Sequence, residues 1–210
     1  MSVRLQGHFL LAGAIGAILA SLLIFLLPGP EGPTGIGSIP TNVVAVLSGL
    51  LLLVGVPALY RAQAKQVGIL GLVGVALLWI AAVSLLLVLT GVQILDLTVP
   101  GVIPHPGGEG PPPAALISAI LGGVLILIGG AIVGITMIRA HVFRASIGRM
   151  ILISSVLLLP MAFVGGNGLL GTILINIDLA LFYAGLAWAG AAISFPVKPT
   201  QVSQSSVQRQ

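Results

Sequence analysis

Six long runs of apolar and small residues, separated by polar or Pro/Gly-rich stretches, divide the chain. The runs lack the strict apolar-polar alternation of a half-exposed strand, and their Leu, Ile, Val, Ala and Gly content is typical of membrane helices. About 20 apolar residues, rising about 1.5 Å each, cross the hydrocarbon core of a bilayer. The pattern therefore predicts six transmembrane helices, at residues 9–27, 42–60, 67–90, 114–138, 150–164 and 169–190.

The composition supports a membrane environment. Of the 210 residues, 58% are hydrophobic and 6% are charged, whereas a water-soluble domain has about 25% charged residues. Backbone groups in lipid must pair within their own segment, which favours helices. We expect an all-α, polytopic membrane protein, with a six-transmembrane-helix bundle in a single domain (1–194) and a disordered cytoplasmic tail (195–210). A signal peptide is the alternative for residues 9–27, but its apolar core would be shorter, about 7 to 15 residues.

The distribution of charge predicts the orientation. When the connections are assigned alternately to the two sides, all eight Lys and Arg fall on one side. The positive-inside rule makes this side the cytoplasm, so we predict a cell (cytoplasmic) membrane protein with both termini inside. On this side we expect a short basic hairpin connection at 61–66 and an amphipathic surface segment at 139–149. The Pro- and Gly-rich stretches 28–41 and 91–113, which carry three of the four acids, are predicted to be outer loops.

The segment around the first basic connection is similar to a known group of proteins. Residues 48–74 combine a helix end rich in Gly, Leu and Pro, a short basic turn and a Gly-rich helix start, as in Gly55-Val56-Pro57-Ala58-Leu59-Tyr60-Arg61 and Gly71-Leu72-Val73-Gly74. This order resembles uncharacterised bacterial six-helix integral membrane proteins of unknown function, which have Leu-Pro-Gly where this chain has Val-Pro-Ala. The resemblance implies a membrane protein, and it assigns no catalytic residue.

Asp178 is the only charged side chain deep inside a predicted helix. Ser21, Trp79 and Asn176 should lie at a similar depth near the bilayer midplane, and together the four residues form a candidate intramembrane polar site. An ionised Asp at a helix centre costs about 2.5 to 3.5 kcal/mol, and no Lys, Arg or His is expected at this depth to pair with it. We therefore expect a neutral Asp178 carboxyl that is hydrogen-bonded to Ser21, Asn176 or the Trp79 indole. The alternative is a proton or cation site, because intramembrane acids often mark such paths.

Other chemistry has little support in the sequence. The chain has no cysteine, and His8, His105 and His141 all lie outside the predicted helices, where they could not serve as haem ligands of a bundle. No phosphate-binding loop, zinc motif or nucleophile with a matching base is present. We predict no enzyme activity, no catalytic residue, no metal and no cofactor. The scattered basic residues also form no stripe that would bind nucleic acid.

Two functions remain open. The first is a structural or interaction subunit or an accessory protein, whose partners are the lipid bilayer and either a homo-oligomer or a larger membrane complex. Strips of small residues, such as Gly13-Ala17-Ser21 and the pair Gly130 and Gly134, would mediate these contacts. The second is a small proton- or cation-coupled transporter or channel that uses Asp178.

Overall fold

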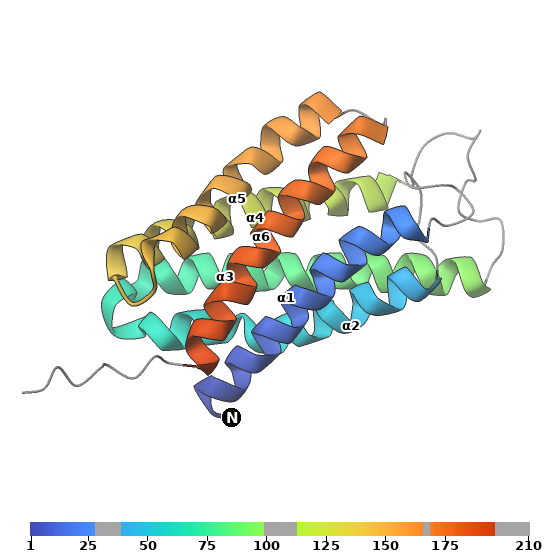
Figure 1. The fold of residues 1–210 in the computed structure, drawn as a ribbon. Helices are drawn as coiled ribbons and strands as arrows, with labels where there is room; N and C mark the ends of the chain where they lie inside the picture. The colour runs from blue at the N-terminus through green and yellow to red at the C-terminus, as the bar shows by residue number, and fades with distance from the viewer. Residues whose placement is uncertain (28–38, 99–112, 166–168, 196–210) are drawn as a thin grey trace, which may run out of the picture.

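The structure, a computed structural model, describes residues 1–27, 39–98, 113–165 and 169–195, and the regular structure within these ranges is helical throughout. The elements are α1 (Val3–Leu26), α2 (Ile39–Gly55), α3 (Pro57–Thr98), α4 (Pro113–Ala140), α5 (Ala145–Gly165) and α6 (Leu169–Ser194). Figure 1 shows them as an elongated bundle. The predicted all-α class is confirmed. The predicted tail from residue 196, the connection at 166–168 and most of both predicted outer loops lie outside the described residues.

Four helical stretches within the described ranges are long and apolar enough to cross a membrane: Val3–Leu26, Ile39–Leu87, Ile120–Ala140 and Leu169–Ser194. The second stretch combines α2 with most of α3 and contains two breaks in the helix, at Val56 and at Gly68. The described side chains of α5 form a shorter apolar helix, Ala145–Leu158. Large apolar side chains are exposed along these helices, as a lipid-facing surface requires.

The helices pack in sequence order around a closed ring. Each helix packs against the next one along the chain, and α6 returns to lie along α1 (Figure 1). The ring encloses a core of buried aliphatic and aromatic side chains from all six elements. Its middle holds a small cavity of about 30 Å³, lined by α2, α3, α4 and α6. This volume matches about one water molecule, but an apolar lining offers water too few hydrogen-bond partners.

The predicted hairpin connection at 61–66 is wrong, because these residues are helical. α2 ends at Gly55, and after Val56 the chain re-enters a helix at Pro57 that continues as far as Val67. The reversal comes at Gly68, whose φ of 54° and ψ of −147° are accessible to glycine and strongly unfavourable for other residues. The segment 57–67 is amphipathic, because Leu59 and Gln63 are buried one turn apart whereas Arg61 and Lys65 are exposed.

Three further expectations at the helix ends are corrected. α3 continues to Thr98, so the predicted outer loop from residue 91 begins later. No separate amphipathic segment occupies 139–149, because α4 runs to Ala140 and α5 begins at Ala145. α1 begins at Val3, so His8 lies within a helix. Its ring makes an edge-to-face contact with Phe195, with centroids 5.3 Å apart, which ties the start of α1 to the end of α6.

Glycines allow the neighbouring helices to approach closely. A Cβ atom at Gly134 of α4 would lie 2.7 Å from the Gly148 carbonyl oxygen of α5, and one at Gly190 of α6 would lie 2.7 Å from the Leu11 amide nitrogen of α1. Gly13 of α1 faces the backbone of α2 in the same way. Backbone atoms cannot rotate out of such a contact as a side chain can. Glycines of the small-residue strips therefore pack against neighbouring helices of this same chain.

Candidate functional site

Asp178 is buried on the side of α6 that faces α5. Its side chain is 3% exposed. Leu181 and Gly185 follow Asp178 by three and seven residues, which places them on the same side of α6, and both adjoin α5. Leu181 lines a groove with α5 residues, and a Cβ at Gly185 would lie 2.7 Å from Ile151 Cγ1. The carboxyl group therefore lies at the α5–α6 interface, away from the basic end of the bundle.

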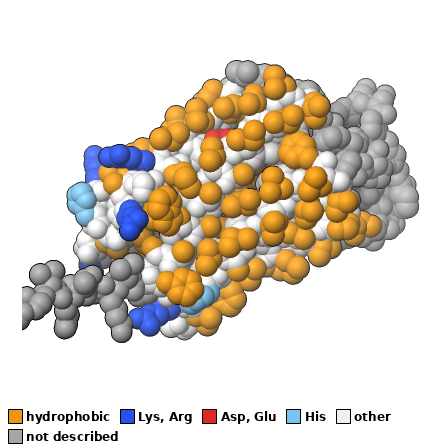
Figure 2. All heavy atoms as spheres, in the orientation of Figure 1, with side chains coloured by type: hydrophobic (Ala, Val, Ile, Leu, Met, Phe, Trp, Pro, Cys, Tyr) orange, Lys and Arg blue, Asp and Glu red, His pale blue; other side chains and the backbone are white. Residues whose placement is uncertain are grey.

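One carboxyl oxygen of Asp178 has no hydrogen-bond partner in the described part of the chain. Oδ1 is buried, and none of the described residues hydrogen-bonds to it. Asp178 is the only Asp or Glu whose side chain is described, and Figure 2 shows one small acidic area enclosed by hydrophobic side chains. A buried polar atom without a partner is unusual and costly. Asp178 is therefore the strongest candidate for a functional group within the helices.

Ser21 and Asn176 lie near the depth of Asp178 without bonding to it. α1 and α6 are antiparallel where Gly190 approaches Leu11. Ser21 lies ten residues beyond Leu11 and Asn176 lies fourteen residues before Gly190, so their depths differ by about 6 Å. Each side chain bonds to its own helix: Ser21 Oγ donates to Ala17 O at 3.0 Å, and Asn176 Nδ2 donates to Thr172 O at 2.8 Å. The predicted similarity in depth is consistent with this register, but the predicted hydrogen bonds to Asp178 are absent from the described part of the chain.

Trp79 is used in a different contact. Pro57 has no N–H, so the Leu53 carbonyl, four residues earlier, loses its usual helical donor. The Trp79 indole nitrogen of α3 donates to this oxygen at 2.9 Å. The Trp79 side chain is 42% exposed and lies on the outside of the bundle. The indole thus compensates for the N–H that Pro57, the first residue of α3, lacks, and it takes no part in a site around Asp178.

Two buried serines on α5 are polar groups that were not predicted as part of the site. Ser154 and Ser155 are buried. Ser154 Oγ donates to Met150 O at 2.7 Å, and Ser155 Oγ donates to Ile151 O at 2.6 Å. A Cβ at Gly130 of α4 would clash with Ser155 Oγ, so Ser155 fills the space that this glycine leaves. A Ser-Ser pair within an apolar run was the available signal, but both hydroxyls are satisfied by their own helix.

Gln63 is a second buried polar group that was missed. It is 0% exposed, and neither its amide nitrogen nor its amide oxygen has a partner among the described residues. It was overlooked because residues 61–66 were expected to form a solvated connection. Close to it in the chain, Arg61 Nη1 donates to Oε1 of the buried Gln6 at 3.1 Å. This bond joins the segment 57–67 to α1 at the basic end of the bundle.

The basic side chains gather at one end of the molecule. The start of α1, the segment 57–67, the end of α4 and the start of α5 meet there and carry six Lys or Arg residues (Figure 1). Figure 2 shows the visible basic groups at this end, with hydrophobic side chains covering the length of the bundle. The predicted grouping of basic residues is thus present among the described residues, whereas the side chains of Glu31, Asp96 and Glu109 lie outside them.

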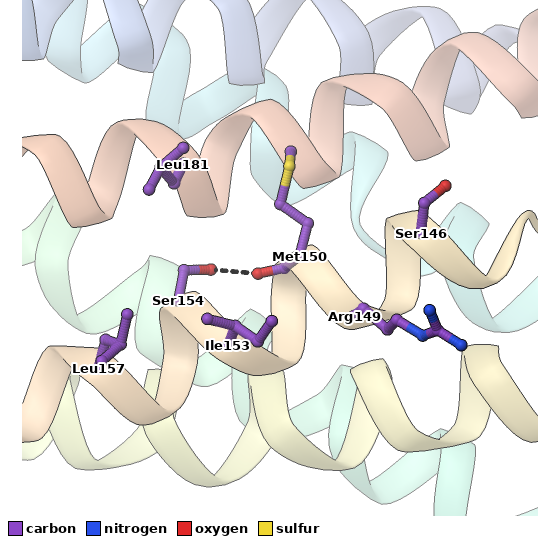
Figure 3. A pocket seen from close by; sticks show the side chains of 7 residues that line it. All are labelled: Ser146, Arg149, Met150, Ile153, Ser154, Leu157 and Leu181. Atoms are coloured by element: carbon purple, nitrogen blue, oxygen red, sulfur yellow. Dashed lines mark hydrogen bonds between the residues drawn. The ribbon is translucent and has the colours of Figure 1, made fainter.

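A groove runs along the outside of the bundle between α5 and α6. Its volume is about 320 Å³, and it is lined by Ser146, Arg149, Met150, Ile153, Ser154, Leu157 and Leu181. Figure 3 shows Ser146 and Arg149 at one end and Leu157 and Leu181 toward the other.

Within the described residues, no three His, Asp or Glu side chains are grouped as metal ligands would be.

Comparison of the chain with protein-family models, curated proteins and solved structures finds no match. The fold and the site define a class only: an all-helical protein with helices long and apolar enough to span a membrane. The resemblance drawn from residues 48–74 stays a prediction.

Proposed function

We propose that the protein crosses the cell membrane six times, with both termini in the cytoplasm, and acts as a structural or interaction subunit. The six-span arrangement is supported by the two breaks that divide Ile39–Leu87 and by the length of α5, whose 21 residues would extend about 30 Å. The orientation is supported by the basic side chains at one end, which the positive-inside rule assigns to the cytoplasm.

The observation that carries the proposed role is the backbone-level packing of the helices. Contacts such as those of Gly134 with Gly148 and of Gly190 with Leu11 join α4 to α5 and α6 to α1 at van der Waals distance. Helices packed in this way resist the rocking of one bundle half against the other that carriers use. A rigid bundle with a continuous apolar exterior suits a protein that offers a fixed surface to membrane partners.

Native mass spectrometry of the protein, extracted gently from its own membrane at its natural abundance, tests this role. We expect a complex of defined stoichiometry, either with a second protein or with further copies of this chain. The same stoichiometry should appear with two unrelated detergents and with the affinity tag at either terminus. A protein that is recovered alone under all four conditions contradicts the proposed role.

The topology can be tested with single cysteines, because the chain has none of its own. In intact cells, Lys65→Cys and Arg144→Cys should resist a membrane-impermeant maleimide, since both positions are assigned to the cytoplasm. Glu109→Cys should react, since it is assigned to the outside. After the membrane is permeabilised, all three should react, which controls for accessibility. Labelling of Lys65→Cys in intact cells would contradict the proposed orientation.

A second function, a proton or cation path through Asp178, is favoured by the unpartnered Oδ1 of this residue. Asp178→Asn is nearly isosteric and cannot ionise, so the fold should be retained and any pH-coupled flux should fall to background. The measurement is dye-detected proton uptake into proteoliposomes under an imposed potential. Asn176→Ala, two residues away on α6, is the control and should leave flux unchanged. Flux that persists in Asp178→Asn excludes this mechanism. If the unmodified protein shows no flux, the path is excluded and the subunit role is the one proposal that remains.

A further inference from the structure

The groove between α5 and α6 has the dimensions of a single acyl chain. It extends along α5 from Ser146 to Leu157, which at about 1.5 Å per residue is roughly 16 Å. This length is about half of the hydrocarbon core of a bilayer, the depth of one leaflet. Its volume of about 320 Å³, spread over that length, gives a mean cross-section of about 20 Å².

A helix would lie over a groove of this width rather than within it. A helix with its side chains is about 10 to 12 Å across and needs a cross-section of roughly 80 Å² or more. An unbranched hydrocarbon chain is far thinner. The walls are also suited to such a chain, because Ile153 and Leu181 are exposed aliphatic side chains and Met150 is flexible enough to adjust to a chain lying against it.

The two ends of the groove differ in chemistry. At the basic end, Arg149 and Ser146 are exposed and supply a guanidinium and a hydroxyl group. Arg149 has no hydrogen bond or ion pair within the described part of the chain. The opposite end, at Leu157 and Leu181, is apolar and one turn from Asp178. A polar entrance at the membrane surface and an apolar floor near the midplane match the two parts of a phospholipid.

We propose that this groove binds one anionic phospholipid from the leaflet at the basic end. Arg149 donates to the headgroup phosphate, since a guanidinium matches phosphate geometry in two parallel hydrogen bonds. Ser146 offers a further donor, and one acyl chain lies along Met150, Ile153 and Leu157. Basic pockets between membrane helices bind anionic headgroups in this way. The site depends only on membrane insertion, and is independent of both functions proposed above.

Lipid titration followed by native mass spectrometry tests the site. The purified protein is titrated with phosphatidylglycerol or with phosphatidylcholine of the same acyl chains, in a detergent that preserves its fold. Both lipids offer Arg149 a phosphate, but the choline cation of phosphatidylcholine offsets its charge, so we expect one phosphatidylglycerol to bind about fivefold more tightly, the effect of about 1 kcal/mol that one basic residue has on binding an anionic lipid. Arg149→Gln should remove this preference. Arg144→Gln removes another exposed charge, which lies outside the groove, and should retain the preference.

A second variant tests the acyl-chain part. Leu157→Trp fills the groove from its apolar end and should weaken binding of both lipids at least severalfold, while Arg149 keeps its charge. Inorganic phosphate should not compete at millimolar concentration, since it has no acyl chain. The proposal is overturned if the two lipids bind equally, if Arg144→Gln acts like Arg149→Gln, if Leu157→Trp has no effect, or if phosphate displaces the lipid.

Discussion

Replacing Gly134 with alanine is expected to destabilise the protein more than any other single methyl group added to α4. The new Cβ would lie 2.7 Å from the Gly148 carbonyl oxygen and 2.9 Å from the Leu152 amide nitrogen. Both atoms belong to the α5 backbone, so α4 and α5 must separate, and α5 would also lose contact with α6. Overpacking of this kind costs about 1 to 3 kcal/mol. The loss of stability is measured as the decrease in thermal unfolding temperature in detergent. The folded fraction that remains after heating is detected by size-exclusion chromatography.

Gly123→Ala is the matched control, because it adds the same methyl group to the same helix. A Cβ at Gly123 would meet no heavy atom within 4 Å. Alanine also favours a helix over glycine by as much as about 1 kcal/mol, so this variant should be neutral or slightly stabilising. Equal unfolding temperatures for the two variants would show that α4 and α5 are not held at backbone contact in solution.

Trp79→Phe is expected to destabilise the protein by about 1 to 2 kcal/mol, because it leaves the Leu53 carbonyl without a donor. The bilayer core holds no water that could donate a hydrogen bond to this carbonyl in place of the indole. Thermal unfolding is again the measurement. Trp188→Phe is the control: Trp188 is exposed to nearly the same extent, 41%, and its indole has no partner among the residues that the structure describes. It should lose little stability.

The cause can be isolated with a double-mutant cycle. Pro57→Ala supplies a backbone N–H four residues after Leu53, where an ordinary helical hydrogen bond can form. In this background Trp79→Phe should cost less than about 0.5 kcal/mol, because Leu53 O keeps a donor. Additive effects of the two substitutions would mean that the indole stabilises the fold by packing rather than through this hydrogen bond.

The helices could be predicted from the sequence where apolar runs alone decide the outcome. Leu169–Ser194 lies close to its predicted range, and Val3–Leu26 ends where predicted but begins six residues earlier. A helix satisfies its own backbone in lipid, so a long apolar run predicts one. The segment 57–67 was missed because Arg61 and Lys65 are typical of a connection. Their spacing of four residues places both on the exposed face of a short helix, while Leu59 and Gln63 cover the core.

The candidate site could be predicted only in part. Depth along a helix follows from counting residues, and Ser21, Asn176 and Asp178 lie near one another in depth. The direction of each side chain depends on how neighbouring helices are rotated and staggered, which the glycine contacts determine. Trp79 donates to the Leu53 carbonyl because Pro57 has no N–H to donate to it. This partner was not predicted, because the prediction compared polar side chains at one depth and did not consider backbone carbonyls.

Because α1 packs against α6, folding of the bundle cannot be completed until α6 has been synthesised. Gly7 and Leu11 belong to α1, which leaves the ribosome well before the α6 residue Gly190. At about 5 to 20 residues per second, roughly 10 to 40 s separate them. During this interval one side of α1 faces lipid or a chaperone where α6 will later lie. A chain whose translation stops before α6 therefore presents an unfilled helix surface that cellular quality control can recognise.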